Sequence, residues 1–175
     1  MNQVPSTPAS EQSARSQDSA RKPRDDSGSL YKVILVPIDF SESSNRTLQF
    51  ATHIAMRENA SLWLLHVFRI PDYAVTHYGW GEQDCRSAEL EARENLSAVE
   101  KEVLSRGIKA KACFRVGHPF EEIVSMANDP EVDLVLIGSH GCSAIKRLLL
   151  GSTAARVVEH ARCAVMVLKE RFPRA

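Results

Sequence analysis

The residues best suited to chemistry lie in one stretch, GSHGCSAIKRLLLGST, which runs from Gly138 to Thr153. Two residues separate its first pair of glycines, and nine separate the second of these from Gly151. Glycine lets a backbone lie close to an anion, and hydroxyls with unpaired amides at a helix start bind phosphate. The stretch therefore predicts a site for a nucleotide or another phosphorylated ligand, without the spacing of a Walker A loop.

A second polar group follows the first apolar run of the chain. KVILVPI, at residues 32–38, leads directly into Asp39. A carboxylate at this point can accept hydrogen bonds from a ribose or a base, or it can serve as a turn or N-cap group before the next helix. Lys146 and Arg147, between the glycines, likewise either face phosphates or form a solvated surface.

Short apolar runs alternate with amphipathic stretches between residues 30 and 168. Buried strands give near-continuous apolar runs, and helices repeat their apolar positions every three to four residues. The expected strands cover 32–38, 62–68, 109–116, 133–137 and 164–168. The expected helices follow the turn at 39–44, cover 84–106, run from Pro119 to about Asn128, and follow Gly151. Residues 69–83 are expected to form a long loop.

This alternation predicts an α/β fold with a five-stranded parallel sheet and helices on both faces. Strand order 3-2-1-4-5 is the expected arrangement. In that order the first and fourth strands lie side by side, and their connections leave in opposite directions. Ligands bind such sheets at the carboxyl ends of those two strands. Asp39 and the glycine stretch should therefore meet at one crevice.

Composition narrows the function further. Lys and Arg together number 22 and balance 22 Asp and Glu, which argues against a nucleic-acid partner or an anionic membrane surface. No apolar run approaches the ~20 residues that cross a bilayer. Residues 1–29 are rich in Ser, Gln, Pro and mixed charge, so we expect a disordered tail before one domain at 30–172. The four cysteines have no CxxC spacing, which favours free thiols in a reducing cytoplasm.

The glycine stretch resembles the universal stress protein family, whose nucleotide-binding members carry G-2x-G-9x-G-[ST]. Gly138, Gly141, Gly151 and Ser152 match every fixed position. KVILVPIDFSESS at 32–44, LLHVF in the second strand and RVVEHARCAVMVLK near the end are similar too, so the resemblance covers nearly all of residues 30–170. It implies a Rossmann-like fold, a homodimer, and binding of ATP or a related adenine nucleotide, with or without magnesium.

The resemblance also assigns roles by motif. The residues that it places at the adenosine end are Pro37, Ile38 and Asp39, with Val67 beside the base. Those along the ribose and first phosphates are Ile137, Gly138, His140 and Gly141. Those at the outer phosphates are Gly151, Ser152 and Thr153. Ala154 stands where family members often carry another hydroxyl, so only its amide can contribute.

Three functions stay open at this stage. The first is an ATP-binding regulatory protein of the stress response that works as a dimer. The second is an enzyme that slowly hydrolyses ATP or phosphorylates itself, although Asp39 is the only acid clearly near the glycine stretch. The third is a nucleotide-free dimeric adaptor, paired through the last strand, 164–168. His66 lies in a buried-looking strand, and we interpret it as a core histidine rather than a catalyst.

Overall fold

The computed structural model describes residues 28–70, 76–77, 79–141 and 150–169. Apart from residues 28 and 29, the predicted tail lies outside these ranges, as does most of the glycine-stretch interior with Cys142, Lys146 and Arg147. Ser29 is already tied to the folded part, because its hydroxyl donates to the carbonyl of Glu58 at 2.9 Å.

Five parallel strands form the sheet. Their bounds are β1 (Val33–Pro37), β2 (Ser61–Phe68), β3 (Ala110–Val116), β4 (Leu134–Gly138) and β5 (Ala164–Leu168). Their order in space is β3-β2-β1-β4-β5, with every neighbouring pair parallel, which confirms the predicted order. In the centre Leu35 of β1 lies opposite Val135 of β4. The strand order reverses at this pair, and open α/β sheets bind ligands at such a point.

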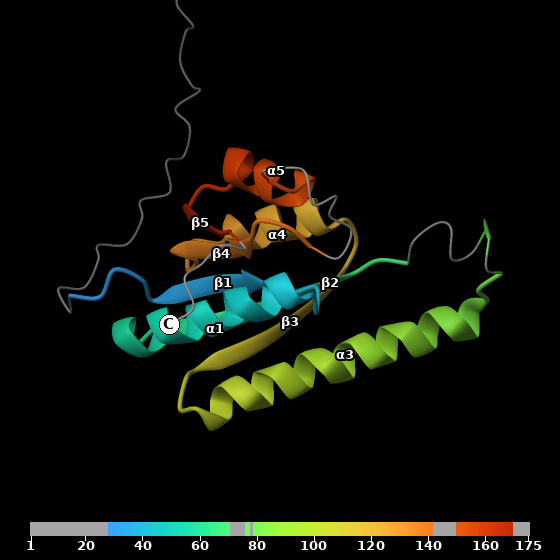
Figure 1. Cartoon of the computed structure of the whole chain (residues 1–175), viewed down its shortest axis with the longest axis horizontal. Helices are drawn as coiled ribbons and strands as arrows, with labels where there is room; N and C mark the ends of the chain where they lie inside the picture. The colour runs from blue at the N-terminus through green and yellow to red at the C-terminus, as the bar shows by residue number, and fades with distance from the viewer. Residues whose placement is uncertain (1–27, 71–75, 78, 142–149, 170–175) are drawn as a thin grey trace, which may run out of the picture.

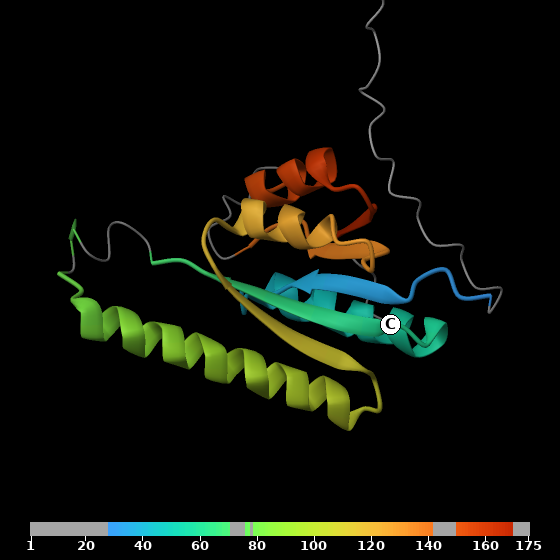
Figure 2. The same ribbon diagram turned by 180° about the vertical axis from the view of Figure 1, so that it is seen from behind.

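The helices cover both faces of the sheet. Their bounds are α1 (Glu42–Glu58), α3 (Glu82–Ser105), α4 (Pro119–Ala127) and α5 (Ser152–His160). In Figure 1, α1 and α3 lie below the sheet and α4 and α5 lie above it, and the reverse view in Figure 2 agrees. The predicted α/β architecture with helices on both faces is therefore confirmed.

Alternate side chains of the central strands enter two separate cores, as the period of two in a strand requires. Ile34 and Val36 point into the cluster under α1 and α3, where they meet Ala51 of α1. Leu35 points the other way, into the cluster under α4 and α5 with Val157. Because β1 and β4 are buried on both faces, their sequences are almost continuously apolar.

Predicted and observed boundaries differ by one or two residues at several elements, and two of these differences have a local reason. The helix expected from Asp84 begins at Glu82, because Asp84 Oδ2 accepts the amide hydrogen of Gly81 at 2.8 Å and so closes the first turn. The strand expected from Asp133 begins one residue later. The carboxylate of Asp133 instead accepts the amides of Lys32 and Val33, at 2.8 and 3.2 Å, at the start of β1.

The two edges of the sheet differ. At β3, Glu100 of α3 accepts the amide hydrogen of Ala112 at 2.7 Å, and Lys111 and Arg115 are exposed. β5 has the sequence AVMVL, in which Ala164 is exposed and the other four residues are partly buried. Charged side chains and a bonded edge amide discourage further strand pairing, so β5 is the more apolar and less protected edge.

Candidate functional site

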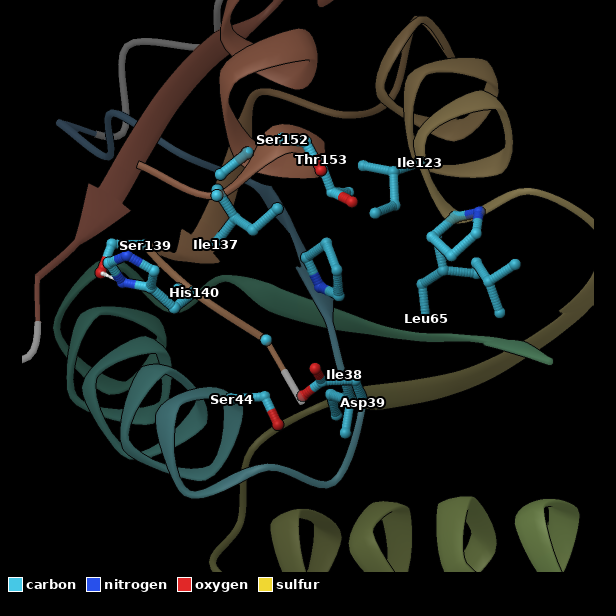
Figure 3. A pocket seen from close by; sticks show the side chains of 17 residues that line it. Ile38, Asp39, Ser44, Leu65, Ile123, Ile137, Ser139, His140, Ser152 and Thr153 are labelled. Atoms are coloured by element: carbon cyan, nitrogen blue, oxygen red, sulfur yellow. Dashed lines mark hydrogen bonds between the residues drawn. The ribbon is translucent and has the colours of Figure 1, made fainter. Parts of the chain in front are cut away.

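A pocket of about 420 Å³ lies at the carboxyl ends of β1 and β4. This volume is within the range of small-molecule sites, roughly 300–1,000 Å³. Figure 3 shows Ser152 and Thr153 across the pocket from Ile38, Asp39 and Ser44. The two segments that the sequence pairs, one after β1 and one after β4, therefore converge on a single space.

The twelve residues to which the resemblance assigns roles all line this pocket, while Lys146 and Arg147 lie outside the described residues. The twelve are Pro37, Ile38, Asp39, Val67, Ile137, Gly138, His140, Gly141, Gly151, Ser152, Thr153 and Ala154. Their location together is a finding; their individual roles toward a nucleotide stay predictions.

The sequence reasoning missed five lining residues. They are Ser44, Leu65, Pro119, Ile123 and Ser139. Leu65 was accessible to prediction, since side chains two apart on a strand share a face and Val67 was already placed. Pro119 and Ile123 are four residues apart on α4 and also share a face. Nothing in the local sequence says that this face overlooks the pocket, because that depends on where α4 crosses the sheet.

One wall of the pocket is the turn that carries Asp39. Asp39 Oδ1 accepts hydrogen bonds from the backbone amide of Ser41 at 3.1 Å and from the Ser41 hydroxyl at 2.5 Å. Ser41 is also the N-cap of α1, where its Oγ accepts the amide of Ser44 at 3.2 Å. Asp39 is therefore not itself the N-cap. It is held by the N-cap residue, with its other oxygen facing Gly141.

The opposite wall contains three glycines, and a side chain at any of them would meet a neighbouring group at close range. A Cβ on Gly141 would collide with Asp39 Oδ2, and one on Gly138 would lie 2.7 Å from Ser43 Oγ. At Gly151 it would lie 3.1 Å from the carbonyl oxygen of Ser139. None of these three glycines has a positive φ. Close packing therefore favours glycine at these three positions, whereas their backbone conformation does not demand it.

The start of α5 supplies polar groups to the pocket. Gly151 is its N-cap and offers no side-chain hydrogen bond, in contrast to Ser41 at the start of α1. The Gly151 amide itself donates to the Ser139 carbonyl at 2.7 Å, which fixes the entry to the helix. The first amides of a helix have no partner within it, and the helix dipole favours an anion there. This end of the pocket is chemically suited to phosphate.

The other end is apolar. Leu65 and Val67 of β2 line it, with Pro119 and Ile123 of α4. Figure 3 places Leu65 and Ile123 on the side away from His140. An apolar recess beside a polar end is suited to a ligand with a flat base at one end and phosphate at the other.

His66 lies between Leu65 and Val67 in β2 but does not line the pocket. Its Nδ1 lies 2.8 Å from the carbonyl oxygen of Ile38. Burial lowers the pKa of His66, while the bond to Ile38 and the charge of Asp39 act in the opposite direction. The ring packs between Phe40 and Phe114, with centroids 4.6 and 5.7 Å away. His66 is thus a hydrogen-bonded histidine within the fold, as interpreted from the sequence.

The described lining offers little for metal or acid-base chemistry. Asp39 is its only carboxylate, and the described residues contain no group of three or more His, Cys, Asp or Glu that would hold a metal ion. Ser139 Oγ lies 3.0 Å from His140 Nδ1, and Ser139 is almost fully buried, with 1% of the residue exposed. In the ranges that the structure covers, no helix has the length and apolar character needed to cross a bilayer.

Residues 30–169 match the model of the Universal stress protein family. The chain belongs to the universal stress protein family. Universal stress protein MJ0531 of Methanocaldococcus jannaschii is 32% identical over 142 residues, which cover 81% of this chain and 84% of that protein. This relative therefore corresponds to about four fifths of the chain.

Solved structures of universal stress proteins have the same fold. The structure of MJ0577, also from Methanocaldococcus jannaschii, aligns with a TM-score of 0.70 at 33% identity, over 82% of this chain and 99% of that one. A universal stress protein in complex with cAMP aligns with a TM-score of 0.59 at 25% identity, over 81% and 98% of the two chains.

Proposed function

We propose that this chain is a regulatory stress-response protein that binds an adenine nucleotide, with ATP as the expected ligand, with or without magnesium. One observation carries the proposal. The Asp39 turn and the glycine stretch, nearly a hundred residues apart in sequence, form the two walls of one pocket that has an apolar and a polar end.

The dimensions and chemistry of the pocket support this ligand. The base would lie against Val67 and the apolar recess, with Pro37 and Ile38 beside it. Asp39 would accept hydrogen bonds from the ribose hydroxyls. The residues that would run along the ribose and first phosphates are Ile137, Gly138, His140 and Gly141. Those that would bind the outer phosphates are Gly151, Ser152 and Thr153, together with the amide of Ala154.

A relative supports the adenine class. The universal stress protein in complex with cAMP is 25% identical and aligns over nearly its whole length. cAMP and ATP share adenosine and differ in their phosphates. The adenosine end is therefore the part of the proposal with the most support, and the choice among phosphate chains is the part that experiment must decide.

Native mass spectrometry of the freshly purified protein tests the proposal directly. We expect an added mass equal to an adenine nucleotide, or its appearance after incubation with ATP. Equilibrium dialysis with labelled ATP, AMP and cAMP then ranks the phosphate chains. No binding of any of the three at millimolar concentration would overturn the proposal and favour the nucleotide-free adaptor.

We propose binding rather than efficient turnover. Phosphoryl transfer needs a positioned base and, in most enzymes, a metal held by carboxylates or hydroxyls. Asp39 alone, engaged with Ser41, supplies little of this. A multiple-turnover phosphate-release assay on the native chain and on Gly151→Ala separates intrinsic hydrolysis from contamination, because a contaminant would give equal rates in both.

We also propose a homodimer, paired through β5, in the cytoplasm. β5 is the less protected edge, and an apolar edge favours pairing with a second copy about a two-fold axis. The cytoplasmic expectation is supported by Cys85 and Cys113, which are free thiols. Light scattering on Val167→Pro and on Ala164→Lys, with the fold checked by circular dichroism, tests the dimer. An unchanged dimer mass in both variants would exclude pairing through this edge.

A further inference from the structure

We propose that His66 is a positioning residue of the nucleotide pocket, because it holds both chain neighbours of Asp39 and thereby fixes where the Asp39 carboxylate lies. His66 does not itself line the pocket, so any effect on a ligand passes through the residues of the turn. The inference rests on the proposed function for its ligand, but its geometry can be tested without one.

The first contact is to the residue before Asp39. A carbonyl oxygen only accepts hydrogen bonds, so His66 Nδ1 carries the hydrogen and donates it to the Ile38 carbonyl at 2.8 Å. The amide of Ile38 donates to the carbonyl of Leu65 at 2.7 Å. Both polar backbone groups of Ile38 are therefore bound to consecutive residues of β2, one residue beyond the end of β1.

The second contact is to the residue after Asp39. Phe40 has a φ of 60°, in the left-handed region that side chains other than glycine rarely adopt. Its ring lies against the imidazole of His66, at a centroid distance of 4.6 Å and an interplanar angle of 30°. This ring contact favours a backbone conformation that the residue would otherwise avoid. Asp39 thus lies between two residues that both contact the imidazole of His66.

The imidazole is itself supported from the far side. Phe114 of β3 lies 5.7 Å from it, and the guanidinium of Arg93 on α3 lies 3.8 Å above the Phe114 ring. The row of rings ends at Phe68, 6.0 Å from Phe114. Phe68 belongs to the same strand as His66 and shares its face, but contacts neither neighbour of Asp39 in this row. It is therefore a matched control for loss of packing.

Two consequences follow for the carboxylate. With Ile38 and Phe40 fixed, Oδ1 stays within reach of the Ser41 amide and hydroxyl, and Oδ2 stays against Gly141. The Asp39 carboxylate is then already in the position where a ligand would meet it. No binding free energy is lost in ordering this carboxylate. Without His66, the turn should sample conformations in which the carboxylate leaves Gly141.

The test compares His66→Ala with variants that keep one contact each. His66→Asn places an amide donor near the position of Nδ1 but has no ring, and His66→Phe keeps a ring without a donor. We expect His66→Ala to weaken ATP binding about tenfold, which is about 1.4 kcal/mol, with smaller losses for Asn and Phe. Phe68→Leu should lose comparable thermal stability and bind ATP within about twofold of the native chain.

A rescue separates positioning from general loosening. Glycine adopts a positive φ without steric cost, so Phe40→Gly in the His66→Ala background should recover part of the lost affinity. A merely structural His66 would give additive losses instead. The inference is overturned if His66→Ala binds as tightly as the native chain, if Phe68→Leu loses as much affinity, or if the double variant shows no recovery.

Failure of the proposed function has a different signature. If the native chain binds no adenine nucleotide, the positioning is read from amide NMR spectra of the ligand-free protein. The inference then predicts that the signals of Ser41 and Gly141 shift in His66→Ala and stay in place in Phe68→Leu. Unshifted Ser41 and Gly141 signals in His66→Ala would overturn it.

Discussion

The two walls of the pocket are built on opposite physical principles. The Asp39 wall is fixed by contacts that side chains make: Ser41 binds the carboxylate, and His66 binds the residues on either side. The glycine wall is fixed by side chains that are missing, because Gly138 and Gly141 leave the space that Ser43 and Asp39 occupy. The first wall should therefore be weakened by truncation, and the second by enlargement.

The largest effect is expected where the walls touch. In Gly141→Ala the new methyl group would displace the Asp39 carboxylate and break its bonds to Ser41. Because Gly141 is exposed, we expect a loss of only about 0.5 kcal/mol of stability, whereas displacement of the carboxylate should lower ATP affinity about 100-fold. Isothermal titration calorimetry and urea unfolding measure the two losses.

Gly81→Ala is the matched control for that variant. A Cβ there would lie 3.7 Å from Asp84 Oδ2, which is an ordinary contact, and the position lies outside the pocket. It should change ATP affinity by less than about twofold. If Gly141→Ala also binds within that range, the two walls do not meet in solution as they do here.

The next effect tests whether the glycine wall depends on space alone. Gly138→Ala places a methyl group 2.7 Å from Ser43 Oγ, so we expect a loss of about 1–2 kcal/mol in unfolding free energy. Ser43→Ala in the same chain removes the colliding oxygen and should restore much of it. Urea unfolding of both single variants and the double variant gives the coupling. Additive losses would mean that Gly138 is needed for some other reason.

Truncation of the Asp39 wall should be milder. Ser41→Ala removes the N-cap of α1 and the hydroxyl that binds Asp39, which costs about 1 kcal/mol of stability. We expect a several-fold loss of ATP affinity as the carboxylate loosens, while Ser41→Thr retains both properties. Thermal unfolding and titration calorimetry check this. Equal affinity in Ser41→Ala and the native chain would show that the wall does not need this bond.

The smallest effect concerns pH. Burial lowers the pKa of His66 below its usual 6.5, so the unfolded chain binds that proton more tightly than the folded chain. This group leaves stability unchanged above about pH 6.5 and reduces it as the pH falls further. His66→Phe has no imidazole and therefore lacks this pH dependence. The unfolding free energy of the native chain minus that of His66→Phe should therefore decrease as the pH falls from about 7.5 to about 5.5.

That comparison also controls for the other histidines, which are present in both chains. Asp39 attracts the protonated imidazole, and Arg93 lies beyond Phe114, so these charges modulate the size of the effect but are present in both chains. If the native unfolding free energy minus that of His66→Phe stays constant or increases toward low pH, the direction assigned to His66 is contradicted.

Much of the fold was predictable because its signals are local. Runs such as KVILVPI are apolar on both faces, and the alternation at 109–116 identifies a strand with one exposed face. Boundaries were less certain. Asp133 stands within an apolar run, but its carboxylate accepts backbone amide hydrogens at the start of β1, a hundred residues earlier in the chain.

The sequence by itself determined the strand order and the meeting of Asp39 with the glycine stretch, because periodicity and the rules of parallel sheets act on each element separately. The other candidate residues came from the resemblance to the family. Only the tertiary structure decided why those residues are needed. The methyl group that Gly141 lacks would strike Asp39, and the proton on His66 Nδ1 binds Ile38. Such contacts join residues far apart in the chain, and no local pattern records which distant side chain will occupy a space.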